Sequence, residues 1–360
     1  PAVACRTVLV VMFALLAAVA HVDAQCGLQW QSAGGYPGAD GIVGAAVTVL
    51  GIMAGPIMIK TSYDPVLSAG AITAGGTLGI LIPPSIVMVM YSVSTNTSVG
   101  ALFMAGVVPG IMLATMLGLT TWYLARKNDY PRLPKAGVLQ RMKSFKESVW
   151  GLMLIVVVMG GIYTGIFTPT EAAAISAVYA FVIAVFVYKD MGLKDVPRVL
   201  LSSANMSAML LYIITNAVLF SFLMTSESIP QAMADWLLDK GLGVITFLLF
   251  VNIILLVAGN FMEPSSIVLI FSPILFPVAM KLGIDPVHFG IMMVVNMEVG
   301  MCHPPVGLNL YVASGITKMG ITELTVAVWP WLLTMLVFLG VVTYWPGLSL
   351  WFPRMLGMIS

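Results

Sequence analysis

The chain contains long apolar stretches that are interrupted by glycine and proline, and this combination restricts its fold more than any other feature. The interrupted stretches are 41–59, 66–93, 243–281 and 287–313, with breakers at 55–56, at 75–76 and 83–84, at 259–266 and at 300–305, respectively. Exposed backbone polar groups are costly in lipid, so a broken segment survives at membrane depth only where protein or a water-filled cavity covers the break. The pattern therefore predicts discontinuous helices or re-entrant hairpins.

The composition excludes a water-soluble protein. Of the 360 residues, 60% are hydrophobic and only 9% are charged, whereas soluble domains carry roughly a quarter charged residues. Most of the surface must face lipid. The net charge of +1 gives no support for a nucleic-acid partner, and three scattered cysteines are too few for a disulfide framework or a metal site.

Uninterrupted apolar runs predict further spans, because about 20 apolar residues cross a bilayer. These runs are 100–125, 149–167, 171–188, 200–224 and 323–345. The loop 126–146 holds seven of the sixteen basic residues and is expected in the cytoplasm. Residues 94–99 are then periplasmic, and the amphipathic stretch 231–240 lies along the interface.

An internal repeat appears when the chain is shifted by 221 positions. The coinciding residues are Pro56 with Pro277, Lys60 with Lys281, Asp64-Pro65 with Asp285-Pro286, Gly79 with Gly300, Pro83-Pro84 with Pro304-Pro305, and Pro109 with Pro330. Counting spans puts the loops at the two equivalent lysines on opposite sides of the membrane. Inverted repeats with paired broken helices are typical of secondary transporters, whose substrate site lies near the midplane.

A broken helix can hold ions without charged side chains. Its free N–H groups favour anions such as a carboxylate, and its free carbonyls suit a hard cation such as Na⁺. The candidate positions are Gly76, Thr77, Gly79, Ile82 and Pro83 in the first copy, and Asn296, Gly300, His303, Pro304 and Asn309 in the second.

Most other charged residues have a structural interpretation. Asp64 and Asp285 precede proline at helix starts and are expected to cap those helices, and Glu171 is expected in the first turn of a helix that begins after Thr168. Glu298 lies beside the second break, and an ionisable group inside a membrane is a candidate for shaping the ion or substrate site.

Four sequence stretches resemble one family, the large permease (membrane) subunit of the tripartite ATP-independent periplasmic (TRAP) transporters. They are AGGTLGILIPPS at 74–85, GIFTPTEAAA at 165–174, LGIDPVHFG at 282–290 and PPVGLNL at 304–310. The resemblance runs from about residue 41 to the end of the chain.

This resemblance implies a Na⁺-driven symporter of the bacterial inner membrane that imports organic acids such as C4-dicarboxylates or sialic acid. Na⁺ is the coupling ion, and no cofactor is expected. The implied partners are a periplasmic solute-binding protein and a small TRAP membrane subunit. The implied fold is an all-α polytopic protein of the ion-transporter superfamily, in which a transport domain of hairpins and discontinuous helices moves like an elevator.

The resemblance also implies two Na⁺ sites, each pairing a hairpin tip with a broken helix. One would use the tip near Gly41 and Gly44 with Gly79, Ile82 and Pro83, and the other the tip near Gly259 with Gly300, His303 and Pro304. The residues expected to bind the substrate are Gly76, Thr77, Asn296, Glu298 and Asn309.

The expected organisation has five parts. They are an atypical N-terminus (1–40), the first repeat (41–125), a basic cytoplasmic loop (126–146), scaffold helices with an interfacial helix (147–240), and the second repeat with the last span (241–360). Residues 6–24 resemble a signal peptide only superficially. The repeat offset matches the apolar limb 243–258 with the mostly polar stretch 22–37. We therefore expect that the front of the first repeat is missing or replaced, and that this chain alone is not a competent transporter.

Two alternatives to a TRAP permease subunit make different demands on the chain. A stand-alone Na⁺/carboxylate symporter of the same fold would not need the binding protein. An intramembrane enzyme such as a protease would need a nucleophile with a base, or paired metal ligands, at membrane depth. The histidines His21, His288 and His303 have no spacing that suits such a site, and no HExxH or GxSxG motif occurs. The sequence thus favours a transporter over an enzyme.

Overall fold

A computed structural model describes residue 47 and residues 64–129, 138–189, 191–228, 232, 235, 243–304, 307–317 and 319–359. The regular structure within these ranges is helical, and they contain no strand. This confirms the expected all-α polytopic class. The predictions for the N-terminus, the break at 55–56 and the first hairpin tip concern residues outside these ranges. Most of 231–240 also lies outside them.

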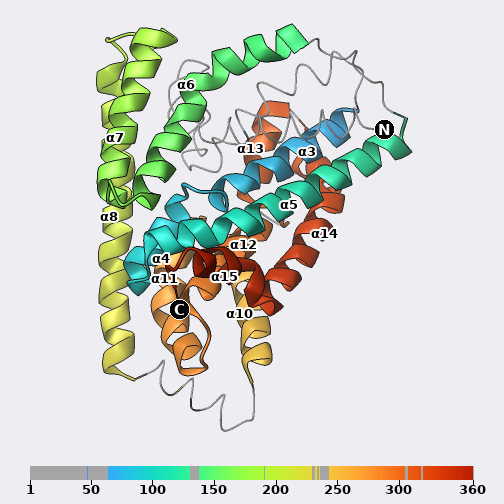
Figure 1. Ribbon diagram of the computed structural model, residues 1–360. Coiled ribbons are helices and arrows are strands. Elements are labelled where there is room, and N and C mark those ends of the chain that lie inside the picture. Colours follow the sequence, from blue (N-terminus) through green and yellow to red (C-terminus); the bar gives the residue numbers. More distant parts are fainter. Residues whose placement is uncertain are drawn as a thin grey trace. The chain divides into compact units, whose positions relative to one another are not determined.

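The helices carry the labels used in Figure 1. They are α3 (Pro65–Thr77), the 3-10 helix η1 (Leu78–Ile80), α4 (Ile86–Thr95), α5 (Val99–Lys127), α6 (Val138–Tyr163), α7 (Pro169–Val182), the π-helical η2 (Ile183–Val187), α8 (Val196–Ser226), α10 (Val244–Gly259), α11 (Pro264–Lys281), α12 (Pro286–Cys302), α13 (Leu308–Thr317), α14 (Ile321–Tyr344) and α15 (Pro346–Met355).

The uninterrupted runs of the sequence correspond to long helices, namely α5, α6, α7 with η2, α8 and α14. Within the described residues, four helices are long and apolar enough to cross a membrane: Val99–Lys127, Pro169–Val187, Pro264–Lys281 and Ile321–Tyr344. Helix α10 has 16 residues. At about 1.5 Å per residue it is shorter than a hydrocarbon core of roughly 30 Å.

The repeat is visible in the positions of the helices. With the offset of 221, α3, α4 and α5 correspond to α12, α13 and α14, and each pair begins within one residue of the expected position. The internal prolines Pro109 and Pro330 lie inside α5 and α14. The two copies thus share one pattern, which is a helix, a break, a short helix and a long helix.

The helix starts follow from the capping residues that the sequence singles out. The Oδ1 atom of Asp285 accepts hydrogen bonds from the backbone amides of Val287 at 2.8 Å and His288 at 3.3 Å, and Asp64 accepts one from Val66 at 2.9 Å. In both copies a proline occupies the first helical turn, where its missing N–H costs nothing. The predicted caps are therefore confirmed.

The start of α7 is a capping box. The Thr168 hydroxyl accepts from the Glu171 amide, and Glu171 Oε2 accepts from the Thr168 amide at 2.8 Å. This reciprocal pair satisfies two helix-end donors. The interpretation of Glu171 as a capping residue is confirmed.

One predicted interruption is wrong. Gly75 and Gly76 lie inside α3, which continues to Thr77, and the break falls only at 78–85. A Cβ atom on Gly76 would lie 2.3 Å from Cγ2 of Val47. This glycine therefore serves close packing, because a glycine within a helix also lets a neighbouring segment approach its backbone.

The chain divides into two compact units. The first comprises Pro1–Gly79, Met112–Val196 and Leu308–Met335, and the second comprises Ile80–Ile111, Pro197–Gly307 and Leu336–Ser360. In the first unit α6 packs against α7, and α3 packs against α13. Figure 1 shows α6 and α7 side by side.

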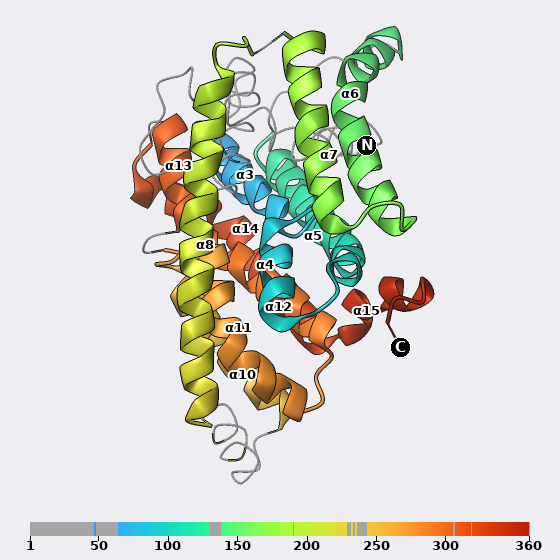
Figure 2. The same ribbon diagram turned by 90° about the vertical axis from the view of Figure 1, so that its left-hand side faces the viewer.

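Helix α12 is the centre of the second unit. Every residue from 287 to 302 is buried, because α10, α11, α15 and α4 all pack against this helix. Helices α10 and α11 form a hairpin that runs beside it, as Figures 1 and 2 show. Helix α12 is thus buried up to its last residue, whereas His303 and Pro304, which follow it, are half-buried.

The caps can be tested by substitution. Asp285→Ala removes both bonds to the first turn of α12 and is expected to lower the free energy of unfolding by about 1 kcal/mol. Asp64→Ala is the matched change in the other copy and is expected to act in the same direction. Thermal unfolding of the purified chain in detergent measures both. A chain that loses no stability in either variant contradicts the capping assignment.

Candidate functional site

The hairpin of the second unit turns within four residues. Helix α10 ends at Gly259, and the amides of Phe261 and Met262 both donate to the carbonyl of Ala258 at 3.0 Å. Glu263 then caps α11, with its Oε2 accepting from the amide and the hydroxyl of Ser266, each at 3.3 Å. The Glu263 carboxylate is thereby engaged in the turn itself.

This turn lies directly against the second helix break. A Cβ atom on Gly300 would lie 2.9 Å from the Cα of Gly259, and one on Gly259 would lie 3.1 Å from the Cα of Gly300. Both positions therefore need a residue without a side chain. The structure brings together Gly259 and Gly300, which the sequence assigned to one ion site.

Side chains join the turn to the break at the same point. Nδ1 of His303, the residue after α12, lies 3.0 Å from Oδ1 of Asn260. The His303 amide donates to the carbonyl of Gly300 at 3.2 Å, which ends the helix. Pro304 follows and is half-buried. The tip and the break therefore form one continuous cluster, which we call the tip junction (Gly259, Asn260, Gly300, His303).

Asn296 lies one turn before Gly300 on the same face of α12 and is fully buried. Its Nδ2 atom donates to the main-chain oxygen of Asn252 at 3.0 Å and to the side-chain Oδ1 of Asn252 at 2.8 Å. Its amide orientation is therefore set by a residue of α10, which leaves Oδ1 as the free acceptor.

Three buried oxygens have no hydrogen-bonding partner within the described part of the chain: Oδ1 of Asn296 and both carboxylate oxygens of Glu298. Glu298 has 0% exposure. Residues two apart on a helix point to different sides, so the two side chains do not share one pocket. Unpaired acceptors inside a membrane protein call for a donor or a cation.

The candidate residues of the first copy are placed only in part. Gly76 and Thr77 close α3, where the Thr77 hydroxyl donates to the Ala74 carbonyl at 2.8 Å and lies 3.7 Å from the sulfur of Met335. Gly79 lies in η1, and Ile82 and Pro83 lie in the turn that follows. Gly41 and Gly44 fall outside the described residues, so a second tip junction in this copy stays a prediction.

Asn309, the last candidate, lies in the first turn of α13 and is fully buried. It belongs to the first unit, as do Gly76 and Thr77. The candidates for substrate binding are thus divided between the units, with Asn296 and Glu298 in the second.

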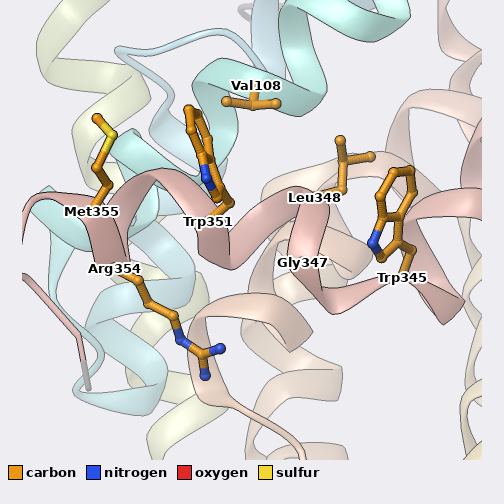
Figure 3. Close-up of a pocket in the computed structure, with 7 residues that line it drawn as sticks. All are labelled: Val108, Trp345, Gly347, Leu348, Trp351, Arg354 and Met355. Atoms are coloured by element: carbon orange, nitrogen blue, oxygen red, sulfur yellow. The ribbon is translucent and has the colours of Figure 1, made fainter.

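A separate groove of about 660 Å³ lies along α15 in the second unit. Its lining residues are Val108, Trp345, Gly347, Leu348, Trp351, Arg354 and Met355. Figure 3 shows the indole of Trp351 pointing toward Val108, whereas the guanidinium of Arg354 extends away from it. None of the predicted site residues lines this groove.

Sequence reasoning missed two residues of the site, Asn252 and Asn260. Asn252 stands alone in the run VITFLLFVNIILLVAG, which otherwise reads as an apolar limb. That isolation is itself a signal, because a buried amide in an apolar helix needs a partner from another helix. Asn260 follows Gly259 directly and could have been included with the predicted tip.

The fold and the tip junction together place the chain in one class of membrane protein. A multi-pass helical membrane protein in which a hairpin turn meets a discontinuous helix has the architecture of membrane transport proteins built on broken helices.

Comparisons with known proteins narrow this class to one family. Residues 40–348 match the family described as tripartite ATP-independent periplasmic transporter, DctM component. The chain is 69% identical over 328 residues to the C4-dicarboxylate TRAP transporter large permease protein DctM of Rhodobacter capsulatus. That alignment covers 87% of this chain and 74% of the relative. It is 52% identical over 314 residues to the protein of the same description in Pseudomonas aeruginosa, with the same coverage.

A more distant relative is the sialic acid TRAP transporter large permease protein SiaM of Vibrio cholerae, which is 36% identical over 319 residues and covers 88% of this chain and 74% of that protein. The chain therefore belongs to the family of large permease subunits of TRAP transporters. It is a multi-pass protein of the bacterial inner membrane and a transporter component, not an enzyme. The resemblance seen in the sequence is confirmed.

The close approach at the tip junction predicts a strong glycine requirement. Gly300→Ala is expected to lower the free energy of unfolding by roughly 1–3 kcal/mol, because the added methyl group forces the hairpin turn away from α12. Gly340→Ala is the control, since a Cβ atom there meets nothing within 4 Å, and it is expected to be neutral or stabilising by up to about 1 kcal/mol. Thermal unfolding in detergent separates the two. Equal stability of both variants contradicts the packing described.

Proposed function

We propose that the chain is the membrane permease subunit of a Na⁺-coupled secondary transporter that imports an organic acid, a C4-dicarboxylate in the first instance. The observation that carries this proposal is the tip junction, where a hairpin turn meets the end of a broken helix. The descriptions of two relatives reported above name C4-dicarboxylates and support the substrate class.

The chemistry of the tip junction supports a cation site. The carbonyls at the end of α12 and in the hairpin turn are oxygen ligands, which Na⁺ prefers over nitrogen or sulfur. Helix ends supply such carbonyls without any charged side chain. The proposed site combines Gly259 with Gly300, His303 and Pro304. The equivalent site of the first copy, with Gly41, Gly44, Gly79, Ile82 and Pro83, is proposed from the repeat alone.

Backbone N–H groups at helix starts suit a carboxylate substrate, and among the candidates Asn309 lies in the first turn of a helix, α13. From the sequence assignment we propose that Gly76, Thr77, Asn296 and Asn309 bind it. The oxygen of Asn296 is an acceptor, so it would receive a hydroxyl, a water or a cation and not a carboxylate oxygen. The proposed contribution of Glu298 is to shape the site.

The proposed partners are those of the family: a periplasmic solute-binding protein that delivers the substrate and a small TRAP membrane subunit beside this chain. The lipid bilayer surrounds the exposed apolar faces. We propose an elevator movement, in which the hairpins and discontinuous helices carry the ions and the substrate together. The coupling ion is Na⁺, and no other cofactor is proposed.

Ion binding can be tested on the purified chain without transport. A ligand that binds only the folded state raises the unfolding temperature by mass action. Sodium chloride is therefore expected to stabilise the chain more than choline chloride at equal ionic strength. Gly300→Ala is expected to lose this difference and Gly340→Ala to keep it. Identical unfolding in the two salts, at every sodium concentration tried, contradicts sodium binding.

Coupled transport needs the complete system in proteoliposomes. With both partners present, uptake of labelled succinate is expected to require an inward Na⁺ gradient and the binding protein. Thr77→Val is expected to lower that uptake several-fold, because it removes the hydroxyl that is proposed to bond the substrate. Thr73→Val is the control, because Thr73 is also buried and bonds to its own helix one turn earlier.

Two outcomes would change the proposal. Uptake that proceeds without the binding protein favours the stand-alone symporter. Uptake that is unaffected by Thr77→Val removes this residue from the site.

A further inference from the structure

A continuous series of hydrogen-bonded, buried polar side chains runs through the second unit beside the tip junction. We call this series the polar path. It begins with the pair of Asn296 on α12 and Asn252 on α10. Asn252 continues it, because its Nδ2 atom donates to Oγ1 of Thr343 on α14 at 3.0 Å. These three side chains are at most 7% exposed. One hydrogen-bonded path therefore connects three helices.

The path extends to the last helix. His288 Nε2 lies 3.3 Å from the main-chain oxygen of Thr343, and His288 Nδ1 lies 2.9 Å from Oγ of Ser349 on α15. Three of its members are also hydrogen-bonded to their own helices, namely Asn252 to the carbonyl of Leu248, Thr343 to that of Leu339 and Ser349 to that of Pro346. All five side chains are thus held in defined orientations.

Stability alone does not account for this arrangement. Interhelical hydrogen bonds in membrane proteins stabilise only modestly, and apolar side chains of similar size would fill the same space without a buried amide. What a connected set of directional bonds adds is a fixed geometry, because each bond is satisfied in only one rotation of one helix against another.

The position of the path along α10 and α12 indicates which contact between these helices its hydrogen bonds fix. Asn252 lies seven residues before Gly259, about two turns along α10, and Asn296 lies four residues before Gly300, about one turn along α12. Both pairs therefore share a helix face. A rotation of α10 that breaks the Asn252–Asn296 pair also moves Gly259 off Gly300.

We propose that Asn252 and Thr343 are positioning residues of the tip junction. Thr343 orients the amide of Asn252, Asn252 orients Asn296, and the pair holds α10 in the rotation that seats the hairpin turn on α12. The end of α14 thereby controls the geometry of a candidate ion site to which it contributes no ligand. The consequence for sodium rests on the proposed function, whereas the geometric role does not.

The geometric role is tested by cross-linking. Asn260→Cys and His303→Cys replace the two side chains that bridge the tip junction, in a full chain whose native Cys5, Cys26 and Cys302 are changed to alanine. Under a mild oxidant this reference is expected to form a disulfide readily. Adding Thr343→Val is expected to slow the reaction roughly three- to tenfold, the effect of losing one hydrogen bond. Thr343→Ser, which keeps the hydroxyl, is expected to restore the rate.

The control is Thr334→Val, the same substitution nine residues earlier on α14. The Thr334 hydroxyl lies 2.9 Å from that of Thr120 on α5, within the first unit. This change is expected to cost comparable stability without altering the cross-linking rate. An unchanged rate in Thr343→Val, or an equal slowing in Thr334→Val, overturns the positioning role.

A measurement of sodium binding distinguishes a failure of this proposal from a failure of the proposed function. Without the cysteine substitutions, Thr343→Val is expected to raise the sodium concentration that gives half of the thermal stabilisation, and Thr334→Val to leave it unchanged. A slowed cross-link in a chain that shows no sodium response supports the positioning role and overturns sodium coupling. A sodium response with an unaltered midpoint in Thr343→Val overturns the link between the path and the ion site.

Discussion

Two helices of the second unit end inside its core, α10 at Gly259 and α12 at Cys302. Helix ends leave backbone groups without partners in their own helix, and lipid cannot supply those partners. The hairpin turn and the break therefore lie against each other, with glycine at the point of contact. The surrounding helices bury α12 from residue 287 to its end, whereas Phe261 and Met262 of the hairpin turn are exposed.

Much of this could be read from the sequence because it depends on local chemistry. Asp285 and the proline after it specify a helix start wherever the chain places them. Thr168 and Glu171 do the same for α7. The long apolar runs need only length and composition to identify them as helices. The repeat was detectable because it preserves these same local signals at one fixed offset.

The contacts between distant segments could not be read in the same way. Gly75 and Gly76 looked like a break, yet Gly76 is needed because Val47 lies against α3. The partner of Asn252 was equally hidden, since only the folded chain brings Thr343 within 3.0 Å of it. A glycine or an asparagine has several structural uses, and the neighbour that decides among them lies far away in sequence.

The complete burial of α12 has a consequence for how the protein enters the membrane. During synthesis α12 emerges after α10 and α11, and it carries a fully buried amide, Asn296, and a fully buried carboxyl, Glu298. Alone in lipid, such groups oppose insertion by a few kcal/mol each. Asn252 of α10 provides the partner that Asn296 lacks. Insertion of α12 is therefore favoured when the α10–α11 hairpin is still beside the translocation channel and enters the bilayer together with α12.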